Sequence, residues 1–294
     1  MVARMRQQGQ LREALDLARK MVSDADRRQA GAAPLPLALH DYGVVSGDLS
    51  LYADAERALR RAIRLLEMAP PRDDSVIPVF RLRLAEVYLD AGRLKEAAAL
   101  LVQLRGTWER TQPGSVELAV VLDNLAWIEL LRNNPSAAEP LLQQSIRILE
   151  ARTGLAPWRL GNILNDYSSM LFTLKRYEEA ASYAERAQTL FDREGVTPDT
   201  TVINTWVLLG AAYAYTGRLQ EAEVYVRRSL SAAPAVFGED SGRTGRLMTV
   251  AAAILRRCGQ KAEAKSIRKK GDQMIAKADR ENPGRFTIDV NALR

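Results

Sequence analysis

Apolar residues recur three and four positions apart along almost the whole chain, in stretches that come in pairs, as expected of amphipathic helices. The pairing is clearest between residues 78 and 114. Pro78 opens one predicted helix, Gly92 marks a turn, and a second helix is predicted over residues 94–111 before Pro113 and Gly114 break the chain. The pattern predicts an all-α chain of helix pairs joined by tight turns.

The pairs repeat with a period of 41 or 42 residues, and small residues keep the register. One position is alanine in seven successive units: Ala14, Ala55, Ala97, Ala138, Ala180, Ala222 and Ala264. Twelve residues earlier the side chain is again small: Gly43, Ala85, Ala126, Ser168, Gly210 and Ala252. Small residues let two helix backbones approach closely, so we expect the helices of each pair to cross here. The predicted turns carry Gly9, Ser50, Gly92, Asn133, Lys175, Gly217 and Gly259, and prolines mark predicted linkers, among them Pro157, Pro198 and Pro234.

The pattern resembles the tetratricopeptide repeat (TPR), in the 42-residue form of the kinesin light chains. The signature positions are Trp206, Leu209, Gly210, Tyr213, Gly217 and Ala222, supported by the helix segment 122–126 and the linker-like segment 236–240. The resemblance implies a right-handed α-solenoid of antiparallel helix pairs, with about six full units and an N-terminal half unit. Each unit contacts only its neighbours in such a fold, and the first helices of the pairs line a concave groove.

The two ends depart from the repeat. We expect a solenoid over residues 1–275 and a tail over residues 276–294 that is either disordered or docks on a surface; Phe286–Val290 alternates like a short strand. The first unit has a helix from Leu11 to about Ser23, but only some eight residues precede its turn at Gly9, so either the solenoid begins with a half repeat or residues upstream are missing. The start lacks the apolar core of a signal peptide, which predicts a cytoplasmic protein, or a periplasmic or secreted one if the true N-terminus lies upstream.

The sequence offers no constellation of catalytic or metal-binding residues. It contains one histidine, His40, and one cysteine, Cys258, which the repeat places five units apart. A phosphate-binding loop with the required lysine is absent. We therefore expect no enzyme activity, no metal site and no cofactor.

The resemblance directs attention to the groove, where we expect a peptide or a partner helix to bind. Side-chain amides can pair with the backbone of any peptide, and aromatic residues often anchor apolar side chains. The alternatives are that the amides are merely solvated and that Trp127 and Phe172 belong to the core. The carboxylate clamp that holds chaperone tails lacks its lysine and arginine partners here, so chaperone-tail binding is disfavoured. The candidate groove residues are His40, Glu86, Asp123, Asn124, Trp127, Asn162, Asn165, Ser169, Phe172, Asn204, Tyr215, Arg246 and Thr249.

The net charge of +6 comes from one end of the chain. Residues 243–294 carry a net charge of +8 and the rest a net charge of −2, so the excess lies on the last repeat and the tail. We interpret this segment as a soluble cap or, alternatively, as a surface that binds nucleic acid or another anionic partner. The cap residues are Arg256, Arg257, Lys261, Lys265, Arg268, Lys269 and Lys270. Three classes of function follow: a protein-binding scaffold or adaptor, a nucleic-acid or anionic-surface binder, and a regulatory subunit of a larger signalling or enzyme assembly.

Overall fold

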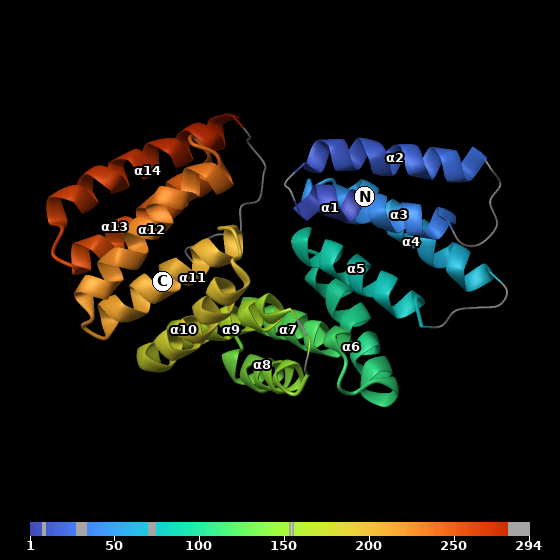
Figure 1. Ribbon diagram of the computed structural model, residues 1–294, viewed down its shortest axis with the longest axis horizontal. Helices are drawn as coiled ribbons and strands as arrows, with labels where there is room; N and C mark the ends of the chain where they lie inside the picture. The colour runs from blue at the N-terminus through green and yellow to red at the C-terminus, as the bar shows by residue number, and fades with distance from the viewer. Residues whose placement is uncertain (8–9, 28–33, 70–74, 153, 155, 282–294) are drawn as a thin grey trace. The chain divides into compact units, whose positions relative to one another are not determined.

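The computed structural model describes residues 1–7, 10–27, 34–69, 75–152, 154 and 156–281, and this part of the chain is helical with no strand (Figure 1). Its helices fall into two compact units, Met1–Leu141 and Leu142–Arg294, with one helix spanning the boundary. The helices are α1 (Val2–Gln7), α2 (Leu11–Arg27), α3 (Pro34–Asp48), α4 (Tyr52–Met68), α5 (Ile77–Asp90), α6 (Leu94–Thr111), α7 (Val116–Leu131), α8 (Pro135–Glu150), α9 (Pro157–Thr173), α10 (Tyr177–Glu194), α11 (Thr200–Tyr215), α12 (Leu219–Phe237), α13 (Gly242–Arg257) and α14 (Lys261–Glu281).

Five of the helix pairs that the period predicts are seen in the contacts between helices. In the first unit α3 packs on α4 and α5 on α6, and in the second unit α9 packs on α10, α11 on α12 and α13 on α14. The first helices of successive pairs also contact one another: α5 touches both α3 and α7, and α11 touches both α9 and α13. Each unit therefore has a continuous layer of first helices. We call α3, α5 and α7 the first-helix layer of unit 1, and α9, α11 and α13 the first-helix layer of unit 2.

The small residues lie where the two helices of a pair cross. The seven repeated alanines are buried, six of them completely. The hydroxyl of Ser168 donates a hydrogen bond of 2.7 Å to the carbonyl oxygen of Ala180, which joins the two register positions directly. At Gly210, an added Cβ would lie 2.6 Å from Cγ2 of Val226 and 3.2 Å from the carbonyl oxygen of Ala222. The predicted crossing is confirmed, and it leaves no room for a larger residue.

The turns within the pairs use the left-handed backbone conformation. Gly92, Gly217 and Gly259 have φ between 73° and 92°, and Ser50, Asn133 and Lys175 adopt φ of 60°, 58° and 61° at the same place in their units. Glycine reaches this region freely, whereas other residues pay a steric cost. The predicted turn positions are therefore confirmed for every turn that the structure describes, and three of them are strained.

Polar side chains join two of the second helices, α4 and α10, to the pair that follows them. Tyr88 donates a hydrogen bond of 2.9 Å to Glu56, and Arg93 donates one of 2.6 Å to the same carboxylate while its guanidinium lies 4.3 Å from the centre of the Tyr88 ring. Tyr213, Arg218 and Glu185 repeat this arrangement in unit 2, with hydrogen bonds of 2.7 and 2.8 Å. The two sets fix the spacing between successive pairs.

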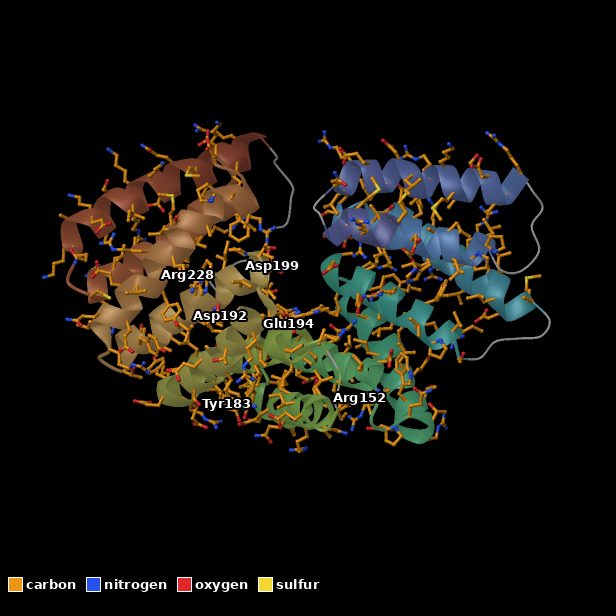
Figure 2. All side chains as sticks on the ribbon, viewed as in Figure 1. Arg152, Tyr183, Asp192, Glu194, Asp199 and Arg228 are labelled. Atoms are coloured by element: carbon orange, nitrogen blue, oxygen red, sulfur yellow. The ribbon has the colours of Figure 1, made fainter. Side chains whose placement is uncertain are left out.

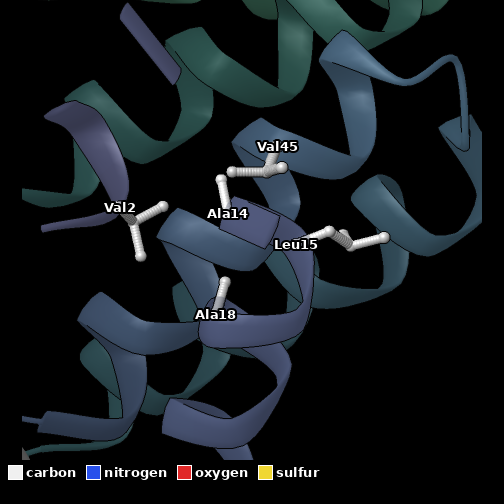
Figure 3. Packing of buried hydrophobic residues seen from close by; sticks show 5 residues of the cluster. All are labelled: Val2, Ala14, Leu15, Ala18 and Val45. Carbon is white, nitrogen blue, oxygen red and sulfur yellow. The ribbon is translucent and has the colours of Figure 1, made fainter. Parts of the chain in front are cut away.

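The ends differ in part from the predictions. At the N-terminus the short α1 packs on α2, and Val2 is buried with Ala14, Leu15, Ala18 and Val45 (Figure 3). At the other end α14 continues through residue 276 to Glu281, so the predicted tail begins inside a helix. The strand-like segment 286–290 lies outside the described residues. Pro234, predicted in a linker, instead lies in the last turns of α12.

Substituting Gly210 with alanine should destabilise the protein by about 1 to 3 kcal/mol, because the new methyl group overlaps Val226 and the α12 backbone. Urea denaturation measures the change. Adding Val226→Ala should recover part of the loss, giving a favourable coupling in the double-mutant cycle. The control is Gly106→Ala on α6, where an added Cβ meets nothing within 4 Å; it should stabilise by about 0.5 to 1 kcal/mol. Equal effects at the two glycines would contradict the crossing.

Replacing Lys175 with glycine should raise the free energy of unfolding by about 0.5 to 1 kcal/mol, since the left-handed turn would no longer strain an L-residue. The reverse change, Gly217→Ala in the equivalent turn, should lower it by about 1 kcal/mol, although an added Cβ there contacts nothing. Both are measured by chemical denaturation. A destabilising Lys175→Gly would show that the lysine side chain, rather than the backbone, determines this turn.

Candidate functional site: the first-helix layers

The histidine of unit 1 is packed between helices. The ring of His40 on α3 lies 4.6 Å from the ring of Phe80 on α5, and its Nδ1 is 3.5 Å from the Asp41 carboxylate. Its Nε2 is enclosed and has no hydrogen-bond partner within the described part of the chain. His40 therefore helps join α3 to α5, and its ring presents little surface to a ligand.

The α7 face offers a more open surface. Trp127 is 39% exposed. Seven other side chains of α7 are buried and form the core side of the helix. Asn124, one turn earlier, is half-buried, and its side-chain amide nitrogen is enclosed without a hydrogen-bond partner among the described residues. Asp123 lies beside it and makes contacts of its own. Trp127 is thus exposed on this first helix and does not belong to the buried core.

The first-helix layer of unit 1 is acidic. Glu86 forms an ion pair with Arg83 on the same helix at 2.6 Å, and Asp48 at the end of α3 pairs with Arg6. Partial desolvation and the nearby carboxylates of Glu86 and Asp48 raise the pKa of Asp90 to about 6. Like charges therefore gather at the C-terminal ends of α3 and α5, where carboxylates also face the negative ends of the helix dipoles.

The asparagines of unit 2 divide into two groups. Asn165 is buried, and its side-chain oxygen accepts a hydrogen bond of 2.8 Å from the hydroxyl of Thr205, which ties α9 to α11. Asn204 is exposed, while Asn162 and Ser169 are half-buried on the layer. Asn162, Asn204 and Arg246 occupy the same position in three successive units, 42 residues apart. Asn165 is thus a structural residue, whereas Asn162 and Asn204 remain available to a ligand.

Asp166 is a half-buried acid on the same face. Its carboxylate accepts a long hydrogen bond of 3.4 Å from the Asn165 amide. Loss of hydration raises the pKa of Asp166 to about 6, because burial penalises its charged form more than the single hydrogen bond stabilises it.

Three aromatic residues meet near the turn that follows α9. We call Phe172, Tyr177 and Tyr215 the aromatic cluster: the rings of Tyr177 and Tyr215 stack at 4.3 Å, and Phe172 meets them at 5.1 and 5.6 Å. Arg257 covers Tyr215 at 4.1 Å and donates a hydrogen bond of 2.7 Å to the carbonyl oxygen of Ala214. Tyr215 is still 45% exposed. Tyr177 was not predicted as part of the site, because it starts a second helix and only the tertiary fold brings it to Tyr215.

Two arginines lie at the start of α13. Arg246 is half-buried and its guanidinium lies beside Gly242, while Arg243 lies over the Phe237 ring at 4.6 Å and reaches the Thr200 hydroxyl at 3.3 Å. Thr249, one turn further along, bonds to the carbonyl oxygen of Gly245 and belongs to the helix packing. Arg243 was missed by the sequence analysis; its spacing of three residues from Arg246 would have placed both on one face.

The signature tryptophan of the repeat is structural. Trp206 is buried, and the guanidinium of Arg228 covers its indole at 4.2 Å. Burial and the Asp192 carboxylate raise the pKa of the neighbouring Tyr225, whereas the positive charge of Arg228 lowers it. Figure 2 labels Arg228 on α12 and Asp192 on α10. The second helices thus cover the tryptophan and hold the pair together.

The predicted basic cap has two parts. Arg257 lies over Tyr215 of the aromatic cluster, whereas Arg256 and the cap residues of α14 lie outside it; all of the cap residues are exposed. Arg268 approaches Asp272 only loosely, at 3.8 Å.

The thiol of Cys258 is half-buried, and burial raises its pKa. Within the described residues, no group of three or more His, Cys, Asp or Glu side chains could hold a metal ion, and no helix is long and apolar enough to cross a membrane.

The tetratricopeptide repeat family model matches residues 78–151, 159–233 and 201–270, which together make up more than half of the chain. The chain therefore belongs to the tetratricopeptide repeat family, whose fold is typical of protein–protein interaction scaffolds. No curated protein sequence matches the chain.

Solved structures show the same fold. BtubC (BKLC) from P. vanneervenii is 22% identical, with a TM-score of 0.64 over 76% of this chain and 91% of that one. The nearly identical TPR-like repeats of a kinesin light chain-type protein from Podosopora anserina are 18% identical, with a TM-score of 0.53 over 68% and 95%. A Rap protein complexed with Competence and Sporulation Factor is 13% identical, with a TM-score of 0.62 over 89% and 74%. These likenesses confirm the helix-pair solenoid class, including its kinesin light chain-like form.

Substituting Asp166 with asparagine should stabilise the protein by about 1 kcal/mol at pH 7.5, because it removes a charge that burial disfavours. The folded-state pKa is raised, so the wild-type protein loses stability as the pH rises from about 4 through 6, and the advantage of the variant should disappear below about pH 4. Urea denaturation across this pH range measures both. A pH-independent difference between the two proteins would contradict the assigned pKa.

Proposed function

We propose that the chain is a non-catalytic scaffold or adaptor that binds an extended peptide or a partner helix along its first-helix layers. The observation that carries the proposal is the placement of exposed aromatic residues. Trp127 on α7, Trp158 on α9 and Tyr215 on α11 are the exposed large aromatic side chains of the described residues, and all three lie on first helices. Large aromatic side chains are frequent in the energetic centres of protein interfaces.

Polar residues beside the aromatics fit the same function. Asn162 and Asn204 recur at one repeat position, and an amide there can both donate to and accept from the backbone of a bound segment. Asn165 takes no part in this role, because its oxygen is engaged by Thr205. Of the structural neighbours, the Rap protein is described in complex with a competence and sporulation factor, which supports a segment bound by this fold.

Photo-crosslinking tests which face meets the partner. A benzoylphenylalanine placed at Trp127 or Asn204 should crosslink a partner protein in the native host, and the crosslinked product should be identifiable by mass spectrometry. The matched controls are Val102 on α6 and Val224 on α12, which are exposed on second helices of the same two units. We expect crosslinks from the first-helix positions at several times the control yield. Equal yields from both pairs of positions would overturn the proposal.

A further inference from the structure

The first-helix layer of unit 2 is rich in arginine. Helix α13 carries four arginines and no acidic residue, and α11 carries no charged residue at all. The third helix of the layer, α9, carries Arg159 and Asp166. The acid on this layer is therefore Asp166, which burial already disfavours in its charged form. Unit 1 shows the opposite character, with Asp48, Glu86 and Asp90 on its own layer.

Arg243 and Arg246 lie three residues apart on α13, about one helical turn, and neither has a counter-charge among the described residues. Burial and the positive charge of Arg246 lower the pKa of Arg243. Neither guanidinium forms an ion pair with a carboxylate in the described part of the chain. Two arginines on the second helices of this unit are paired instead: Arg186 with Glu150, and Arg227 with both Glu223 and Glu263. An anion placed between Arg243 and Arg246 would relieve their repulsion and gain charge-assisted hydrogen bonds.

The residues around the two arginines indicate how a ligand would lie on this layer. Arg246 continues the row of Asn162 and Asn204 across the three helices, so a chain lying on this layer meets amides first and the guanidinium groups at its end. Arg243 contacts Thr200 at the start of α11, which brings its charge to the neighbouring helix. The exposed Tyr215 offers an apolar contact at the other end of α11.

We propose that the first-helix layer of unit 2 binds an acidic segment of a partner protein, with a carboxylate of that segment held between Arg243 and Arg246. This inference rests on the proposed function and specifies the chemistry of its ligand. The amides of Asn162 and Asn204 bind the backbone of the segment, and Tyr215 contacts an apolar side chain.

A protein segment fits this layer better than a nucleic acid does. A phosphate backbone carries a charge at every nucleotide and requires cations along its whole path. Here the middle helix, α11, is uncharged, and its exposed side chains are those of Asn204 and Tyr215. A segment with acidic residues at one end and mixed residues elsewhere matches this distribution of charge.

Fluorescence anisotropy with the full chain tests the inference. The probes are three fluorescein-labelled pools of random 12-residue peptides, in which half of the positions are Asp and Glu, Lys and Arg, or Ser and Asn. At about 150 mM salt we expect the acidic pool to bind at least tenfold more tightly than the other two. The double variant Arg243→Glu with Arg246→Glu should abolish that preference, and Arg246→Gln, which removes the charge but keeps a polar side chain, should weaken binding about tenfold.

The matched control is Arg193→Glu on α10, an exposed arginine of the same unit on a second helix. Like each substitution in the double variant, it replaces an arginine with a glutamate, and it should alter binding by less than twofold. Circular dichroism should show that every variant is folded. Three results would overturn the inference: no preference for the acidic pool, an equal loss in Arg193→Glu, or a single-stranded DNA probe that outcompetes the acidic pool. Equal binding of all three pools together with first-helix crosslinking would leave the proposed function standing, whereas failure of both would remove it.

Discussion

The close crossing of the two helices in each pair is the constraint on which the rest of the structure depends. A small residue on the first helix meets an alanine on the second, as Ser168 meets Ala180 and Gly210 meets Ala222. A larger side chain at either place would push the backbones apart and shift every contact that follows along the chain. Because the crossing recurs every 41 or 42 residues, the first helices of each unit come to lie side by side and form one layer.

The layers differ from the second helices in what they leave exposed. The second helices carry networks of ion pairs, such as Arg93 with Glu56 and Glu96, in which most charges are compensated. The first-helix layers instead leave aromatic rings, amides and, in unit 2, uncompensated guanidinium groups at their surface. Aromatic and arginine side chains are frequent in the energetic centres of protein interfaces. For this reason we propose that the first helices bind a partner, while the second helices mainly stabilise the fold.

The sequence predicted the fold well because the fold depends on local, periodic features. The alanines, the small residues twelve positions earlier and the turn residues lie where the pattern placed them, even where Lys175 and Asn133 replace glycine. The site was predicted less well, because exposure depends on contacts between helices. Their positions in the repeat predicted that Asn165 and His40 bind a ligand. In the structure Asn165 accepts a hydrogen bond from Thr205, and the ring of His40 packs against Phe80. Tyr177 was missed for the converse reason, since its partner Tyr215 comes from another helix.

The central claim is that a partner lies on the first helices. Hydrogen–deuterium exchange of the full chain, with and without saturating acidic peptide pool, tests it most directly because it reports on every helix at once. The account predicts slower exchange in α9, α11 and α13, strongest at the start of α13, with little change in α10 and α12. Protection confined to the second helices, or to α14 with its exposed basic residues, would contradict it.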